Sequence, residues 1–142
     1  TLLAKAGLNR LGETGTGHPL DAEDWLPAPG QGAIAIECRS ADDATRSVLS
    51  AIDHAPSRAA LLAERALLAA LGGNCHSPIA VLTTHHGDEL TLQAAIYSPD
   101  GAVRIDGLLR FAATDLAAPA RLAADLLVRA PEVVSDHFSG DA

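Results

Sequence analysis

Aromatic residues and methionine are scarce in this chain. Only 3% of its residues are aromatic, with one Trp, one Tyr and two Phe, and it contains no Met. Hydrophobic residues nevertheless make up 48% of the sequence, so its core must be built from Ala, Leu, Ile and Val. So few rings offer little surface on which bases could stack, which argues against binding of single-stranded nucleic acid.

Basic residues and long apolar runs are also in short supply. Ten Lys and Arg stand against 18 Asp and Glu, giving a net charge of −8 and a pI near 5.0, so a phosphate backbone would be repelled. No apolar run approaches the roughly 20 residues needed to cross a bilayer, and the first residues lack the order of a signal peptide. We therefore expect a cytoplasmic protein with neither nucleic acid nor membrane as partner.

The chain contains only two cysteines, Cys38 and Cys75. In a reducing compartment, two free thiols are expected rather than a disulfide. Cys75 is the more informative of the two because it lies in a glycine-rich loop, Leu71 to Pro78, directly after a helical pattern.

The start of the chain indicates a piece of a longer polypeptide. A helical pattern over residues 2–11 stops at Gly12 and has no capping residue before it, which is unusual for a native N-terminus. Residues 13–30 are rich in Gly and Pro and are expected to form a loop or linker. At 142 residues, the chain can hold one small complete domain plus the edge of another.

A strand and two helices are predicted next. Residues 31–38 alternate with Ile34 and Ile36 on one face, which predicts a strand. A helix over about residues 41–53 should begin at a capping box formed by Ser40 and Asp43. It is expected to bury Val48, Leu49 and Ile52.

Pro56 should close that helix, and Ser57 should cap a second one that ends at Gly72.

The remainder of the sequence changes to a period of two. Strands are predicted over residues 79–84, 89–97 and 103–111, joined by turns at Gly87 and at Pro99-Asp100-Gly101. A closing helix over about residues 115–130 follows; its expected cap is Thr114, and its expected inward residues are Leu116, Leu122, Leu126 and Leu127. An antiparallel meander combined with helices predicts a two-layer α+β fold.

Several separate motifs together resemble one enzyme family. They are Leu26-Pro27-Ala28-Pro29-Gly30-Gln31-Gly32-Ala33, Ile36-Glu37-Cys38-Arg39, Glu64-Arg65-Ala66, the glycine-rich turn with Cys75 and Pro78, and Ser98-Pro99-Asp100-Gly101. In this order and spacing they resemble porphobilinogen deaminase, also called hydroxymethylbilane synthase. The resemblance runs over almost the whole chain and indicates the C-terminal portion of that enzyme.

The resemblance implies a transferase of tetrapyrrole (haem) biosynthesis. Such an enzyme joins four porphobilinogen molecules head to tail, with loss of ammonia, on a covalent dipyrromethane primer. The residue in the position that carries the primer through a thioether is Cys75, and a soft sulfur nucleophile suits that bond. The implied partners are porphobilinogen, linear pyrrole oligomers and the missing N-terminal domains of the same polypeptide, with the full-length enzyme a monomer.

Other site residues are also implied by the resemblance. Arg10 matches a family arginine that contacts carboxylates, and the segment Gly30, Gln31 and Gly32 matches the hinge and cleft. The family's catalytic aspartate belongs to a motif that this chain does not contain, so no catalytic residue is expected here and the fragment alone should be inactive. Asp43 and Asp100 are better explained as a cap and a turn residue.

The family architecture implies three parts. Residues 1–28 would be a C-terminal remnant of the second α/β domain, which resembles periplasmic binding proteins. Residues 29–45 would be the hinge and the strand that returns to the first such domain, and residues 46–142 the C-terminal α+β domain that carries the cofactor cysteine. A strand at residues 31–38 would then lack its sheet, and we expect it to pair with another copy of the chain or to repack.

Two other readings remain open. One is a structural or regulatory α+β domain with inert thiols. The other is a metal-binding module using Cys75, His76, His85 and His86, but adjacent strand residues point to opposite faces and no Cys-x-x-Cys spacing supports a zinc site. No metal is expected, and a catalytic role for His76 is not expected either, because neighbouring side chains usually point apart.

Overall fold

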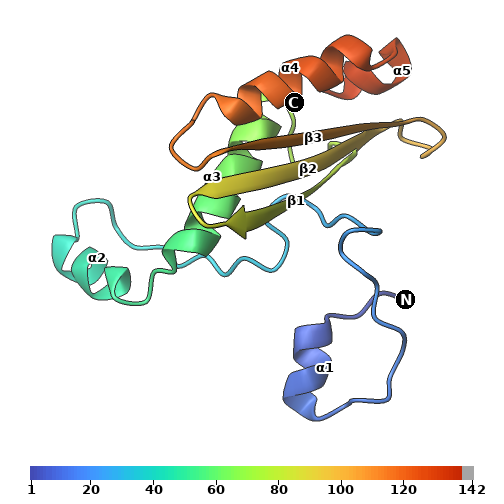
Figure 1. The fold of residues 1–142 in the computed structure, drawn as a ribbon. Coiled ribbons are helices and arrows are strands. Elements are labelled where there is room, and N and C mark those ends of the chain that lie inside the picture. Colours follow the sequence, from blue (N-terminus) through green and yellow to red (C-terminus); the bar gives the residue numbers. More distant parts are fainter. Residues whose placement is uncertain (139–142) are drawn as a thin grey trace.

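A three-stranded antiparallel sheet organises the C-terminal part of the molecule (Figure 1). The computed structural model describes residues 1–138. Within them the sheet has the order β1 (Ile79–His86), β2 (Glu89–Tyr97), β3 (Arg104–Ala112). The turn between β1 and β2 contains Gly87 at φ +64°, a backbone conformation that L side chains rarely adopt. The predicted α+β fold is confirmed.

One face of this sheet is covered by two helices, α3 (Ala55–Ala70) and α4 (Ala118–Arg129), as Figure 1 shows. The alternation of side chains along the strands turns the apolar residues of β1 and β2 toward these helices. The buried side chains that form this core include Leu67, Leu71, Val81, Leu90, Leu92, Ile96, Phe111, Leu122, Leu126, Val134 and Phe138. Ala, Leu, Ile and Val make up most of this core, as the composition predicts, and its aromatic members among the described residues are the two phenylalanines.

The opposite face of the sheet is mixed in character. Over β1 and β2, Leu26 packs on Ala80 and Ala95 to form a small second cluster. Over β3 the face carries Arg104 paired to Asp106 at 2.7 Å, together with the exposed Leu108. Only part of this face is therefore covered within residues 1–138.

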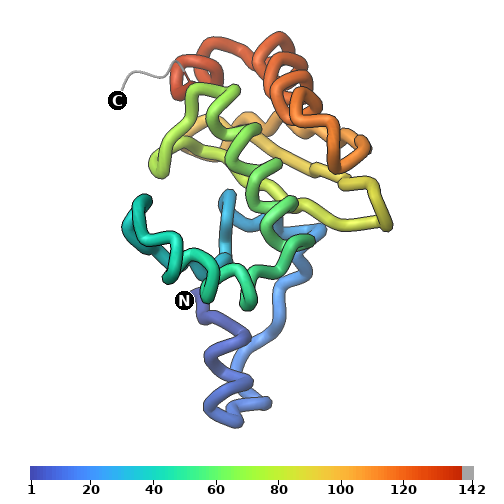
Figure 2. The backbone as a smooth tube through the Cα atoms, turned by 90° about the vertical axis from the view of Figure 1, so that its left-hand side faces the viewer, coloured from blue at the N-terminus to red at the C-terminus, as the bar shows by residue number. Residues whose placement is uncertain are grey.

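The N-terminal elements lie away from the main core. Neither α1 (Lys5–Leu11) nor α2 (Asp43–Ser50) contains a buried residue. Figures 1 and 2 both show α1 at the far end of the molecule from α4. Gly12 ends α1 with φ +76°, as the sequence predicts.

The predicted strand over residues 31–38 is wrong for this structure. The segment forms a turn and then irregular chain, and Ile34 is 92% exposed. A strand requires a neighbouring ladder of backbone groups, and no strand within residues 1–138 lies beside this segment to supply one.

The α2 helix is shorter than predicted, and its cap is different. Its N-cap is Asp42, whose carboxylate accepts hydrogen bonds from Thr45 N at 3.0 Å and Thr45 Oγ1 at 2.9 Å. The predicted burial of its apolar face is also wrong, since Val48 and Ile52 are 72% and 67% exposed. Leu49 is half-buried. The helix has no partner surface within the described residues.

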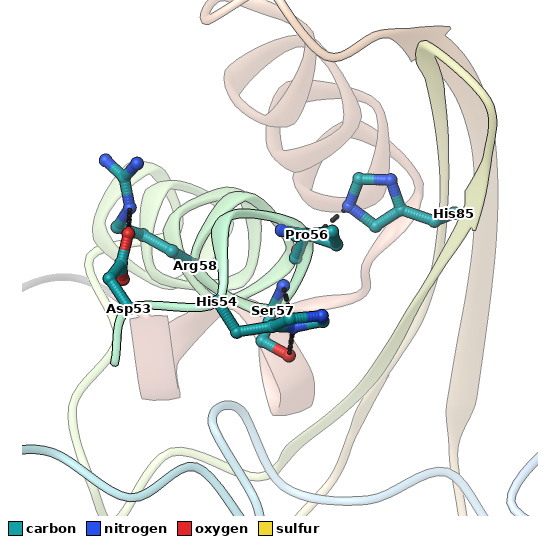
Figure 3. A network of polar contacts seen from close by, with 6 residues as sticks. All are labelled: Asp53, His54, Pro56, Ser57, Arg58 and His85. Carbon is teal, nitrogen blue, oxygen red and sulfur yellow. Dashed lines mark hydrogen bonds and ion pairs between the residues drawn. The ribbon is translucent and has the colours of Figure 1, made fainter. Parts of the chain in front are cut away.

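The start of α3 also corrects the prediction (Figure 3). The N-cap is His54, whose Nδ1 accepts from Ser57 N at 3.4 Å and lies 2.8 Å from Ser57 Oγ, and Ser57 itself lies inside the helix. Pro56 lies in the first turn, where its missing N–H costs nothing. The Pro56 carbonyl accepts a 2.8 Å bond from His85 Nε2, which ties this helix start to the end of β1.

The later elements agree more closely with the sequence. The β2 bounds are as predicted, β1 continues to His86, and β3 is displaced by one residue. However, α4 begins at Ala118, Thr114 is not its cap, and Leu116 is 85% exposed, contrary to prediction. Leu122 and Leu126 are buried as expected, and Leu127 packs against the core.

A short helix, α5 (Glu132–Ser135), and a 3₁₀ turn, Asp136–Phe138, follow α4. Across residues 1–138, no helix is long and apolar enough to cross a membrane.

Candidate functional site

The loop that carries Cys75 begins where α3 ends. Gly72 adopts φ +69°, as predicted for a helix C-terminus. Gly73 N donates to the Leu68 carbonyl at 2.9 Å. A Cβ on Gly73 would lie 2.5 Å from Leu68 Cδ1 and 3.2 Å from Ser77 Oγ. The chain therefore turns here in a space that only glycine fits without displacing neighbours.

Two side chains on either side of Cys75 brace this loop. Ser77 Oγ accepts a 2.8 Å hydrogen bond from Asn74 N, and Asn74 Oδ1 accepts a 2.8 Å bond from His76 N. The Ser77 hydroxyl also lies 3.5 Å from the His137 carbonyl, in the C-terminal 3₁₀ turn. Cys75 is a free, exposed thiol at the centre of this braced loop.

Asn74 shapes the loop through its side chain and not through a left-handed backbone. No non-glycine residue among those described has a positive φ, and Asn74 contributes a side-chain acceptor instead. The sequence did contain this signal, because Asn commonly accepts from a backbone N–H two residues further on.

Arg10 lies in the last turn of α1 and is exposed. The chain has ten Lys and Arg residues, and seven arginines form ion pairs within the described residues. The three left without an ion pair there are Lys5, Arg10 and Arg65. The Arg10 guanidinium is therefore available for an anion.

The segment Gly30, Gln31 and Gly32 forms a turn beside α3. Gly30 and Gly32 have φ of +71° and +78°. Gly30 N donates to Glu64 Oε2 at 2.8 Å. Gln31 is exposed. Sequence reasoning missed Glu64 as a partner of this turn, because the two residues are 34 positions apart.

The structure does not bring all the predicted site residues together. Cys75 lies in the connection between α3 and β1, whereas Arg10 lies on α1, at the opposite end of the molecule (Figures 1 and 2). The turn at Gly30 contacts α3 through Glu64, on the helix that leads to the Cys75 loop.

The histidines of the metal-binding reading are engaged separately. His85 bonds to the Pro56 carbonyl, and His86 Nε2 lies 3.3 Å from Thr84 Oγ1. No group of three His, Cys, Asp or Glu side chains suited to a metal ion is found in residues 1–138.

Asp100 has the turn role that the sequence predicts. The Ser98 hydroxyl donates to Asp100 Oδ1 at 2.6 Å, and Ala102 N donates to the same oxygen at 3.1 Å. These two bonds stabilise the charged form, so the pKa of the Asp100 carboxyl lies below its ordinary value of 3.8, with the Ser98 bond the larger cause. Both bonds shape the connection between β2 and β3.

Comparisons with known proteins agree with the resemblance in the motifs. The family model described as "Porphobilinogen deaminase, C-terminal domain" matches residues 59–127. The model described as "Porphobilinogen deaminase, dipyromethane cofactor binding domain" matches residues 1–47. Together the two ranges take in most of the chain.

Curated relatives with the same name match at high identity. The porphobilinogen deaminase of Sphingopyxis alaskensis is 48% identical over 140 residues, which is 98% of this chain and 44% of the relative. That of Xanthomonas oryzae pv. oryzae is 47% identical over 98 residues, which is 68% of this chain and 32% of the relative. The chain therefore spans less than half the length of these relatives.

Proposed function

Because the chain belongs to the porphobilinogen deaminase family, we propose that it is the part of a hydroxymethylbilane synthase that holds the dipyrromethane primer. The complete enzyme would join four porphobilinogen molecules head to tail, with loss of ammonia, within tetrapyrrole biosynthesis. The observation that carries this proposal is the free, exposed thiol of Cys75 in a braced loop of the matched C-terminal domain.

The loop fits a covalent primer on Cys75. The side chain is exposed, while the groups that hold the loop in shape are the half-buried Asn74 and Ser77. A bulky group on the sulfur would extend into solvent and leave these hydrogen bonds intact. When bound, the dipyrromethane supplies the pyrrole end to which further units are added; Cys75 supplies the permanent anchor through a thioether.

Charge limits what this chain can do for the ligand. Each pyrrole ring brings two carboxylates, whereas the chain carries a net charge of −8 and three cations without an ion pair in residues 1–138. We propose that Arg10 binds one ligand carboxylate, a task for which its planar fork is suited. The turn of Gly30, Gln31 and Gly32 would form one edge of the same site and offer the Gly32 amide, since Gly30 N donates to Glu64 Oε2 and Gln31 N to the Ala28 carbonyl.

Most of the basic groups and the proton-transfer residue would come from sequence outside this chain. The two family-model matches are separated between residues 47 and 59. This gap supports a boundary near residue 46, and we propose that residues 46–142 are the cofactor-bearing domain, with residues 1–28 from the second α/β domain and 29–45 as the hinge. On this division the fragment alone has no catalytic residue and no turnover. The two free thiols favour a cytoplasmic location.

Intact-mass measurement of the full-length enzyme tests the anchor. We expect the wild-type polypeptide to carry an added mass of two pyrrole units, mapped to Cys75 by peptide sequencing. Cys75→Ser should lose both the added mass and the activity, because a hydroxyl is a poorer trap for the reactive methylene. Cys38→Ser is the matched control and should keep the added mass. An active wild-type enzyme with an unmodified Cys75 would contradict the proposal and favour an inert thiol.

A further inference from the structure

A five-residue segment, Leu26–Gly30, crosses from one face of the sheet to α3; we call it the strap. Its first residue, Leu26, is 7% exposed, whereas the preceding Trp25 is 61% exposed. The following residue, Gln31, is exposed as well. The strap is therefore a short segment that packs against the domain, and the residues on either side of it, Trp25 and Gln31, are exposed to solvent.

Three contacts hold the strap on three different elements. Leu26 packs on Ala80 and Ala95, on the sheet face away from the helices. The Pro27 carbonyl accepts a 2.7 Å hydrogen bond from Val81 N, at the free edge of β1. Gly30 N donates to Glu64 Oε2 on α3 at 2.8 Å. Because the contacts lie at different places, they fix the direction of the strap as well as its position.

Glu64 stands out among the acidic residues of α3's surroundings. It is half-buried in the middle of the helix, and no Lys or Arg in residues 1–138 lies within ion-pair distance of it. Within these residues, the Glu64 carboxylate accepts one hydrogen bond, from Gly30 N. A hydrogen bond to a charged acceptor is stronger than a neutral one, so this bond is well suited to hold a backbone group in place.

The absence of a side chain at Gly30 lets the strap backbone come close to Glu64 on α3. The Gly30 φ of +71° is one that L side chains rarely adopt, and a Cβ there would lie 3.1 Å from Leu61 Cδ1, one helical turn before Glu64. The backbone of the strap thus approaches α3 closely, and a side chain at this position would push it away.

The C-terminal half of α3 and its C-cap, Leu71, are packed in the core. Leu67 and Leu71, which follow Glu64 toward the Cys75 loop, are 0% and 1% exposed. At 1.5 Å per residue, Glu64 lies about 10 Å along the helix axis from Leu71. A group fixed to Glu64 is therefore fixed in relation to the loop that carries Cys75.

We infer that Glu64 is a positioning residue: through Gly30 N it holds the backbone of Gly30, Gln31 and Gly32 at a set place relative to the Cys75 loop. The inference rests on the proposed function, because it takes that backbone as one edge of the ligand site. Glu64 itself touches no ligand. Its task is to keep the edge of the site from moving while the pyrrole chain grows from Cys75.

The test uses the full-length enzyme and the variants Glu64→Ala and Glu64→Gln. Alanine removes the acceptor without lowering helix propensity, whereas glutamine keeps an oxygen that can accept from Gly30 N. Amide hydrogen exchange at Gly30 should become roughly tenfold faster or more in Glu64→Ala, because its hydrogen bond is lost. In Glu64→Gln it should stay within about threefold of wild type, since a neutral acceptor is only somewhat weaker.

Steady-state kinetics supply the functional readout. Glu64→Ala should raise KM for porphobilinogen several-fold while kcat changes by less than about twofold, and Glu64→Gln should restore KM. Asp125→Ala is the matched control: it removes an exposed helical carboxylate of the same domain, paired only with Arg129. It should leave both KM and Gly30 exchange unchanged.

Two results would overturn the inference. One is unchanged exchange at Gly30 in Glu64→Ala, which would mean that Glu64 does not hold the strap. The other is an equal rise in KM in Glu64→Ala and Glu64→Gln with Gly30 still protected, which would assign the effect to charge. The mass on Cys75, measured in the same samples, reports the proposed function separately, so a bare Cys75 and a loose strap are distinguishable.

Discussion

Glycine at position 107 shows how closely single residues are fitted in the core. Gly107 lies in β3 and faces α4; a Cβ there would be 2.8 Å from Leu122 Cδ1 and 3.0 Å from Leu126 Cδ2. Both leucines are buried core residues, so neither can swing into solvent to make room. The absence of a side chain at this strand position is what lets α4 approach the sheet.

Gly107→Ala should lower the free energy of unfolding by about 1–3 kcal/mol through overpacking. Urea unfolding of the full-length enzyme, followed by circular dichroism, measures the change. The control is Gly7→Ala in α1, where no atom lies within 4 Å of the added Cβ and alanine is the better helix former. Equal stabilities of wild type and Gly107→Ala would show that α4 shifts freely on the sheet.

At this scale, the sequence predicts residues with a strong local signal and misses those with distant partners. Cys75 could be singled out because the chain has only two cysteines and one of them follows Gly72 and Gly73. Glu64 could not, because its partner is 34 residues away. The contact between Ser77 and the His137 carbonyl spans 60 residues and was likewise out of reach.

Among the elements, the connection between β2 and β3 makes the stability of the fold depend on pH, through the Asp100 carboxyl. The pKa of the Asp100 carboxyl is lowered from its ordinary value of 3.8, first by the Ser98 hydroxyl and then by Ala102 N. A depressed folded pKa means that the charged form stabilises the fold. This contribution is present above about pH 4 and is lost as pH falls through the folded value.

Asp100→Asn should therefore reduce the stability of the enzyme most at neutral pH, with the difference from wild type shrinking as pH falls below about 4. Unfolding free energies measured between pH 2 and 7 provide the comparison. Asp24→Asn removes a carboxylate from a loop without removing a turn bond and serves as control. A difference that grows as pH falls would contradict the stated direction.

The elements that the sequence predicts well are those with a local cause. The β-meander was predictable because period-two alternation and two glycine turns occur within consecutive residues. Helix starts were less predictable, since Asp42 and His54 took the capping positions expected for Ser40 and Ser57. The strand expected over residues 31–38 failed because a strand depends on a neighbour that this stretch of chain does not contain.

Over the whole molecule, exposed apolar side chains are concentrated in the first 52 residues. Ile34, Ile36, Val48 and Ile52 are each at least 58% exposed. Single exposed apolar residues are ordinary, but several on neighbouring segments favour association. Their number fits a chain that spans less than half of its relatives' length.

The isolated chain should therefore self-associate. Sedimentation velocity should show a larger species whose share rises with concentration, and Ile34→Lys combined with Ile52→Lys should shift the chain toward monomer. Leu116→Lys is the control, because Leu116 is 85% exposed but lies far along the chain from these residues, just before α4. A single monomeric boundary at all concentrations would count against this expectation.

The single tryptophan has an unusual place for so small a domain. Trp25 is 61% exposed and directly precedes Leu26, the first residue of the strap. The indole lies outside the main core, so we expect its emission to respond more to docking or release of the neighbouring strap than to packing within that core. The chain thus carries its own optical probe at the segment whose placement Glu64 controls.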